Sequence, residues 1–209
     1  MLLNYGGNVG LFGKMQHVVD EFYKARSSSF APTMRGVGLT MEGIENNPVM
    51  YELVCELPWS TADGNHIVWR DWLSRYVQTR YGNVTNPKVS EAWLLLAQSI
   101  YGCPADNVSQ GCRESVFCAR PSLDAKWVSS WAETVDYYEP DSVIRAARLM
   151  AEAAADMPAN ANFRYDLVDI TRQAVAERAR LVYNEIVAAY KAHDRKMFRH
   201  TTQRFLSLL

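Results

Sequence analysis

The sequence lacks a long apolar run. No stretch approaches the roughly 18 apolar residues needed to cross a bilayer, and the first residues lack the pattern of a signal peptide. A charge excess is also missing, because 22 basic residues face 23 acidic ones and leave a formal charge of −1. We therefore expect no membrane span and no general attraction to nucleic acid, and a neutral ligand is the simpler expectation.

Metal ligands are few. The four cysteines and four histidines are scattered without the spacing of a zinc site, so we expect no metal. Cys55 lies on an apolar helical stretch and is expected to be a buried small hydrophobic residue. Cys103 and Cys112 flank a polar loop that a disulfide could close in an oxidising compartment. The sequence leaves the bridged and the open forms equally favoured.

What the chain does have is material for a core, since 48% of its 209 residues are apolar. Two short strands are expected, at residues 1–5 and 35–40, and each leads through glycine into a helix, which is the α/β pattern. Beyond Trp59 the strand signals end. We expect a mainly α protein with domains at 1–62 and 63–209.

Apolar residues recurring at spacings of three and four predict the helices. In the longest one, Leu167, Ala174, Leu181 and Ala188 fall seven apart, and Val168, Val175, Val182 and Ala189 form a second row, which predicts a wide buried face. The basic residues near the end of the chain are expected to form a solvated face. The expected helices cover residues 11–24, 48–57, 69–81, 86–100, 141–156, 161–192 and a final segment near 196–205.

Glu42 ends the second expected strand. In a parallel sheet the strands are buried and their carboxyl ends meet solvent, which is where an α/β barrel has its active site. A simpler interpretation is that Glu42 favours the positive end of the following helix, an effect of roughly 0.3 to 1 kcal/mol. Local sequence alone favours this simpler interpretation.

A glycine-rich loop follows the first expected strand, in residues 4–13. The spacing, lysine and hydroxyl of a phosphate-binding loop are missing, so we expect no nucleotide and no other cofactor. The alternative is a tight barrel loop in which the Asn4 amide and the Tyr5 ring face a pocket. Sugars are bound by that combination of a hydrogen-bonding group and an aromatic plane.

Longer strings of sequence are more specific than any short motif. They are NYGGN at 4–8, GLFG at 10–13, MEGI at 41–44, ELPW at 56–59, RYG at 80–82, ARPSL at 119–123 and FRYDLVDITRQ at 163–173. These strings, which cover nearly the whole chain in order, resemble the α-N-acetylglucosaminidases of glycoside hydrolase family 89.

The resemblance implies a retaining exo-hydrolase that removes terminal α-linked N-acetylglucosamine, built on an α/β barrel followed by a helical domain. Glu42 matches the nucleophilic glutamate of the family. Leu2 and Tyr5 match positions expected to line the sugar pocket, with Asn4 beside them. A secreted, periplasmic or lysosomal setting is also implied.

The resemblance implies that the chain is a fragment. A retaining glycosidase uses two carboxyl groups about 5 to 5.5 Å apart, and the acid/base glutamate of the family matches nothing here. We therefore expect the last two β/α units of the barrel and part of the helical domain, inactive alone and prone to self-association at the barrel cut. The alternative is an independent helical module for protein interaction, without catalysis.

Overall fold

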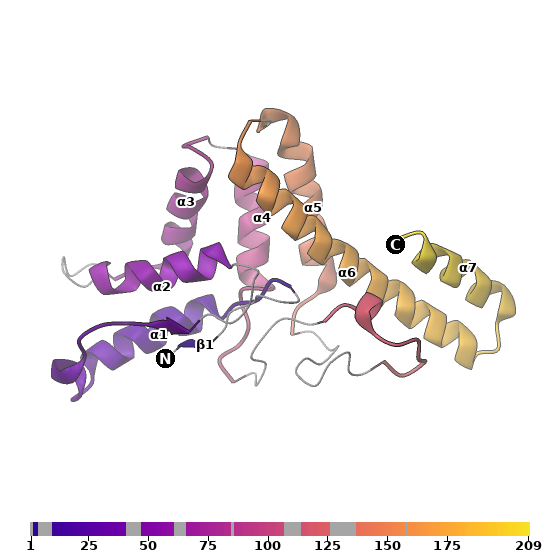
Figure 1. The fold of residues 1–209 in the computed structure, drawn as a ribbon, viewed down its shortest axis with the longest axis horizontal. Coiled ribbons are helices and arrows are strands. Elements are labelled where there is room, and N and C mark those ends of the chain that lie inside the picture. The colour runs from indigo at the N-terminus through magenta and orange to yellow at the C-terminus, as the bar shows by residue number, and fades with distance from the viewer. Residues whose placement is uncertain are drawn as a thin grey trace.

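The chain forms a mainly helical structure with two short parallel strands near its N-terminus (Figure 1). The computed structural model describes residues 2–3, 10–40, 47–60, 66–84, 86–106, 114–125, 137–157 and 159–209. The strands are β1 (Leu2–Leu3) and β2 (Leu39–Thr40). The helices are α1 (Met15–Ser27), α2 (Pro48–Ser60), α3 (Trp69–Arg80), α4 (Pro87–Gln98), α5 (Pro140–Ala153), α6 (Ala161–Lys191) and α7 (Arg195–Leu206), with short 3-10 helices η1 (Ala31–Thr33), η2 (Val116–Cys118) and η3 (Ala154–Asp156).

Side-chain caps explain where three of the helices begin. Asn86 accepts a hydrogen bond from the Lys88 amide at the start of α4, where Pro87 fits the first turn. Asn160 accepts from the Phe163 amide before α6, and Asp194 caps α7. The helices predicted from residues 69, 86 and 161 begin within a few residues of those positions, which confirms the predictions.

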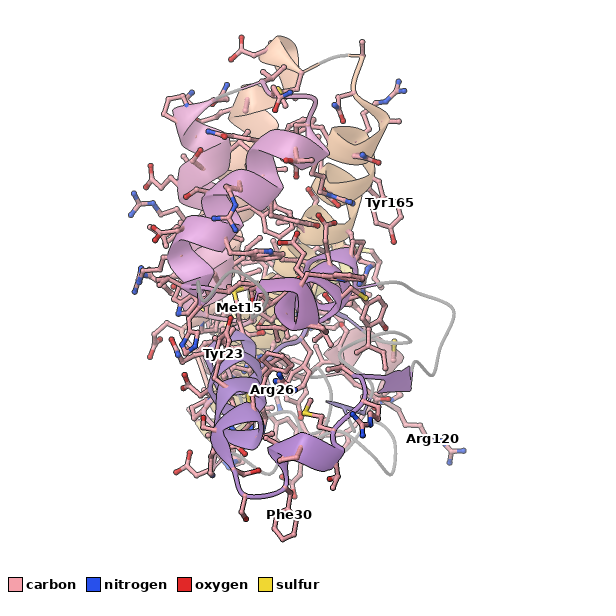
Figure 2. The ribbon with its side chains drawn as sticks, turned by 90° about the vertical axis from the view of Figure 1, so that its left-hand side faces the viewer. Met15, Tyr23, Arg26, Phe30, Arg120 and Tyr165 are labelled. Carbon is pink, nitrogen blue, oxygen red and sulfur yellow. The ribbon has the colours of Figure 1, made fainter. Side chains whose placement is uncertain are left out.

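The helices pack around one core. α5 packs between α4 and α6, and α7 folds back on α6 (Figure 1). One cluster of buried apolar side chains has members from Leu11 to Ala174. The segment that carries the strands and the first half of α6 therefore share a core. Figure 2 shows Met15 inside the molecule, whereas Phe30 projects into solvent. No helix in the described residues is long and apolar enough to cross a bilayer.

Several predicted boundaries were wrong near the N-terminus. β2 starts at Leu39 rather than at residue 35, and α1 starts at Met15 rather than at residue 11. The backbone of residues 13–15 instead bonds to the segment after α4, with the Gly13 amide donating to Ile100 O at 3.2 Å. α2 continues through Pro58 to Ser60.

The predicted buried face of α6 was also wrong in part. Val168 is 68% exposed and Ala188 is exposed, whereas Val182 and Ala189 are buried. The buried face of the first half of the helix instead follows the spacing three, four, three, four, because its neighbours α5 and the loop after β1 lie on that side. That row consists of Phe163, Asp166, Ile170, Gln173 and Glu177.

The cysteine predictions had mixed outcomes. Cys55 is exposed, because α2 turns Leu53, Val54 and Leu57 toward the core and leaves Cys55 on the outer side. Cys103 is buried, and Cys112 lies outside the described residues, so the bridge between them stays a prediction. The basic residues at 191, 195, 196 and 199 are exposed as predicted, whereas Arg204 is half-buried and pairs with Glu185.

Candidate active site

The two strands end at the same edge of the sheet, and the candidate residues follow them in the sequence. β1 and β2 pair in parallel, with Leu2 opposite Leu39 and Leu3 opposite Thr40. The chain continues from these aligned carboxyl ends into Asn4 and Tyr5 on one side and into Glu42 on the other. Those three residues lie outside the described residues, and only the backbone of Leu2 is described. Their roles stay predictions.

The loop after β1 is firmly held where it is described. Besides the Gly13 contact, the Met15 amide donates to Tyr101 O at 2.9 Å and the Cys103 amide donates to Gly13 O at 3.0 Å. A Cβ on Gly13 would lie 2.6 Å from Met50 Sδ, so only glycine fits there without displacing its neighbour. The end of the glycine-rich loop, just before α1, therefore serves close packing.

Asn47 connects the chain after β2 to the loop after β1. It is 3% exposed, and its Nδ2 donates to Phe12 O at 2.6 Å. Its backbone oxygen accepts from the Tyr51 amide, so Asn47 immediately precedes α2. Its side chain therefore joins the two segments that follow the strands.

A second buried polar group joins this region to α6. Gln173 Oε1 accepts from the Leu11 amide at 3.2 Å, and its Nε2 donates to Glu177 Oε1 at 2.8 Å. Glu177 also accepts from the Tyr138 hydroxyl at 2.6 Å and from Arg180 Nη2 at 2.7 Å. Sequence reasoning missed these residues, although their spacing with Phe163 and Ile170 marks them as one face of the helix.

A third polar cluster lies at the start of α6. Arg80 binds both oxygens of Asp166, at 2.5 and 2.7 Å, and the Tyr81 hydroxyl donates to Asp166 Oδ2 at 2.7 Å. Trp93 Nε1 in turn donates to the Tyr81 hydroxyl at 2.8 Å. The bidentate ion pair therefore ties α3 to α6 in the core, and the bond from Trp93 to Tyr81 joins α4 to the same cluster.

The tyrosines beside this cluster make the fold sensitive to alkali. Burial raises the pKa of Tyr76 and of Tyr81 far above the usual value, and the negative charge of Asp166 raises both further. At Tyr101, burial is the largest cause of the raised pKa. Above pH about 10 these groups ionise only in the unfolded chain, so the unfolded state binds fewer protons and stability falls as pH rises.

We expect the free energy of unfolding to drop by about 1.4 kcal/mol per pH unit for each of these tyrosines above pH about 10. Urea unfolding at pH 9 to 12, together with phenolate absorbance, measures this. Ionisation of all 11 tyrosines in the folded chain near pH 10 would contradict the expected burial.

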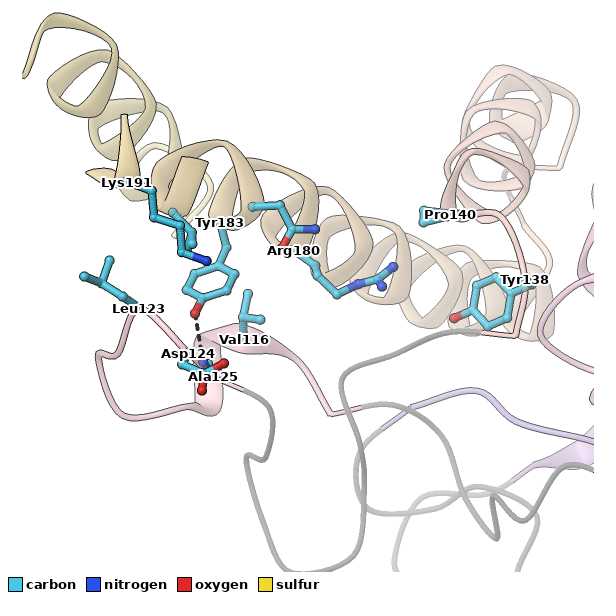
Figure 3. Close-up of a pocket in the computed structure, with 11 residues that line it drawn as sticks. Val116, Leu123, Asp124, Ala125, Tyr138, Pro140, Arg180, Tyr183 and Lys191 are labelled. Carbon is cyan, nitrogen blue, oxygen red and sulfur yellow. Dashed lines mark hydrogen bonds between the residues drawn. The ribbon is translucent and has the colours of Figure 1, made fainter. Parts of the chain in front are cut away.

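Two cavities flank α6. One, of about 470 Å³, is lined by Tyr138, Arg180 and Tyr183 among others, and Figure 3 shows Tyr183 pointing from α6 toward the loop that carries Asp124 and Ala125. The Tyr183 hydroxyl accepts from the Ala125 amide at 2.9 Å and donates to Ser122 O at 3.1 Å, which holds this loop on the helix. The aromatic rings and charged groups that line this cavity suit a polar ligand.

The other cavity is a groove of about 600 Å³ between η2 and the outer side of α6. Its walls are mostly apolar and include Phe117, Leu167, Val168 and Val175. Within the described residues, which do not include Glu42, no group of three His, Cys, Asp or Glu side chains could hold a metal ion.

Two family models match the chain. The model of the α-N-acetylglucosaminidase C-terminal domain matches residues 72–209, which is more than half of the sequence. The chain belongs to the α-N-acetylglucosaminidase family. The model of the tim-barrel domain of that enzyme matches residues 1–61, so the expected fold, a helical region preceded by a barrel fragment, is confirmed.

Individual relatives agree with the family models. Human α-N-acetylglucosaminidase is 37% identical over 194 residues, which make up 93% of this chain and 24% of the human protein. A family 89 glycoside hydrolase from Clostridium perfringens, solved with 2-acetamido-1,2-dideoxynojirmycin, superposes on the whole chain with a TM-score of 0.87 and 29% identity.

A variant of the Clostridium perfringens enzyme gives a similar match. Two of its glutamates are replaced by glutamine, and it was solved in complex with its substrate GlcNAc-α-1,4-galactose. It superposes with a TM-score of 0.86 and 28% identity. The match covers 100% of this chain but only 23% of that protein. The chain therefore spans about a quarter of the length of the relatives it matches.

Proposed function

We propose that residues 1–209 form part of a retaining glycosidase that removes terminal α-linked N-acetylglucosamine from glycans. The observation that carries this is the parallel pairing of β1 and β2 in a chain of the α-N-acetylglucosaminidase family. Because the strands are in register, the segments that carry Asn4, Tyr5 and Glu42 leave from the same edge of the sheet.

Glu42 is the nucleophile in this proposal. Its carboxylate attacks the anomeric carbon, the bond from that carbon to the leaving-group oxygen breaks, and a second carboxylic acid protonates that oxygen. Water then hydrolyses the glycosyl ester with the second group as base. Leu2, Asn4 and Tyr5 line the sugar pocket, and the acid/base residue comes from a part of the barrel outside this chain.

The domain division fits this assignment. Residues 1–62 supply the last two β/α units of the catalytic barrel, and residues 63–209 supply the helical domain. The matches of two separate family models, to 1–61 and to 72–209, support it. The longer protein would act in a secreted, periplasmic or lysosomal setting.

The isolated 209-residue chain is expected to show no hydrolysis of an aryl α-N-acetylglucosaminide, because it lacks a second catalytic carboxyl group and a closed pocket. A longer polypeptide that carries the same residues with a complete barrel should hydrolyse it. Release of the phenol by both proteins is measured under the same conditions. Turnover by the short chain at a comparable rate would overturn the fragment assignment.

Self-association of the isolated chain is the second expectation. The described sheet has only two strands, and each has an outer edge with no partner in the described residues. The apolar groove beside α6 adds surface that favours association. Sedimentation velocity at rising concentration should show dimers or larger species, and a monomer at all concentrations would contradict this.

A further inference from the structure

Gln173 is a side chain of the helical domain that makes a hydrogen bond to the loop after β1. It lies in the middle of α6 and is 2% exposed. Its Oε1 accepts from the Leu11 amide, 162 positions away in the sequence. Leu11 follows the segment that carries Asn4 and Tyr5, so this contact acts on the loop assigned to the sugar.

The orientation of the Gln173 amide is set by Glu177. The Leu11 amide needs an acceptor and the Glu177 carboxylate needs a donor, and an amide side chain offers one of each. Glu177 is itself 2% exposed and is held by Tyr138 and Arg180. The contact to Leu11 is therefore supported by a chain of charge-assisted hydrogen bonds.

The other tethers of this loop differ in kind. Gly13 is held by backbone atoms of Ile100 and Cys103, and Phe12 is held by Asn47 from the barrel segment. Gln173 thus provides a side-chain contact from the helical domain that can be removed without changing the backbone of either partner.

We propose that Gln173 is a positioning residue for the sugar-binding loop. Fixed by Glu177, it holds the Leu11 amide, six residues after Tyr5 in the sequence, so the helical domain influences how tightly the barrel segment binds the sugar. The assignment of these two residues to the sugar rests on the proposed function. The contact to Leu11 is observed independently of it.

The first test uses the 209-residue chain and needs no activity. Gln173→Met keeps the length of the side chain and removes both hydrogen bonds. Amide hydrogen exchange should become about tenfold or more faster at Leu11 and stay unchanged at Leu53 in α2. Unchanged exchange at Leu11 would overturn the proposal, because the loop would then be held without Gln173.

The second test measures kinetics in a longer polypeptide with a complete barrel. Gln173→Glu places two carboxylates in contact and should raise KM for an aryl α-N-acetylglucosaminide about tenfold or more, with a smaller change in kcat. Adding Glu177→Gln restores one carboxylate and one amide, and should recover much of the lost affinity. A KM within twofold of the unsubstituted value for Gln173→Glu would overturn the proposal.

Tyr81→Phe is the matched control. It removes a buried hydrogen bond to the same helix, at Asp166, and contacts neither strand loop. It should lower stability while leaving KM unchanged, and an equal rise in KM would show that Gln173 acts only through general stability. If the unsubstituted longer protein has no activity, the proposed function fails, whereas exchange at Leu11 still decides the role of Gln173 in the loop.

Discussion

Replacing Glu42 with glutamine is expected to abolish hydrolysis in a longer polypeptide that carries residues 1–209 with a complete barrel. Glutamine keeps the shape of the side chain but cannot form the glycosyl ester. We expect kcat to fall by about 10⁴-fold or more, as for the removal of other catalytic nucleophiles. The measurement is the release of phenol from an aryl α-N-acetylglucosaminide.

Two nearby acids provide controls for this substitution. Glu45 is three residues further along the chain, and Glu56 is exposed on α2. Glu45→Gln and Glu56→Gln should leave kcat within about threefold of the unsubstituted value, as expected for carboxylates that take no part in the mechanism. Full activity in Glu42→Gln would remove this carboxylate from the mechanism, and the simpler interpretation as a helix-start charge would then apply.

Loss of the ion pair at the start of α6 should have the largest effect on stability. Asp166→Ala leaves the Arg80 guanidinium without its carboxylate in a site where the arginine side chain is only 12% exposed. It also removes the acceptor of the Tyr81 hydroxyl. We expect the free energy of unfolding to fall by about 3 to 5 kcal/mol, measured by urea unfolding near pH 7.

A double substitution separates the loss of the ion pair from the cost of leaving one charge buried without its partner. Arg80→Met with Asp166→Leu replaces both charges by apolar side chains and should be less destabilised than Asp166→Ala alone. The exposed pair between Lys88 and Glu152 is the matched comparison, and Glu152→Ala should cost much less stability than Asp166→Ala. A loss below about 1 kcal/mol for Asp166→Ala would show that this cluster does not hold the helices together.

Helices with caps or strong periodicity could be predicted from the sequence. α4, which has asparagine and proline at its start, and α6 appear almost where they were expected. The later start of α1 could not be predicted, because it depends on backbone contacts of residues 13–15 to residues 100–103, far along the chain. Tertiary contacts overrode the local pattern there.

The buried polar residues of α6 were missed for a different reason. Periodicity methods count apolar positions, so the valines at 168 and 175 were assigned to the core and Asp166, Gln173 and Glu177 were not. Their burial depends on partners in α3, in the loop after β1 and beside α5. The candidate Glu42 came from its position after a strand and from the family strings, and its role still awaits a test.

Trapping of the glycosyl ester is the most direct test of the central claim. A longer polypeptide with a complete barrel is incubated with a fluorinated, slowly hydrolysed α-N-acetylglucosaminyl fluoride, digested, and sequenced by mass spectrometry. We predict that the added sugar is found on the peptide containing residues 41–44, esterified to Glu42. A sugar attached to a different carboxylate, in an enzyme that is active, would contradict the assignment.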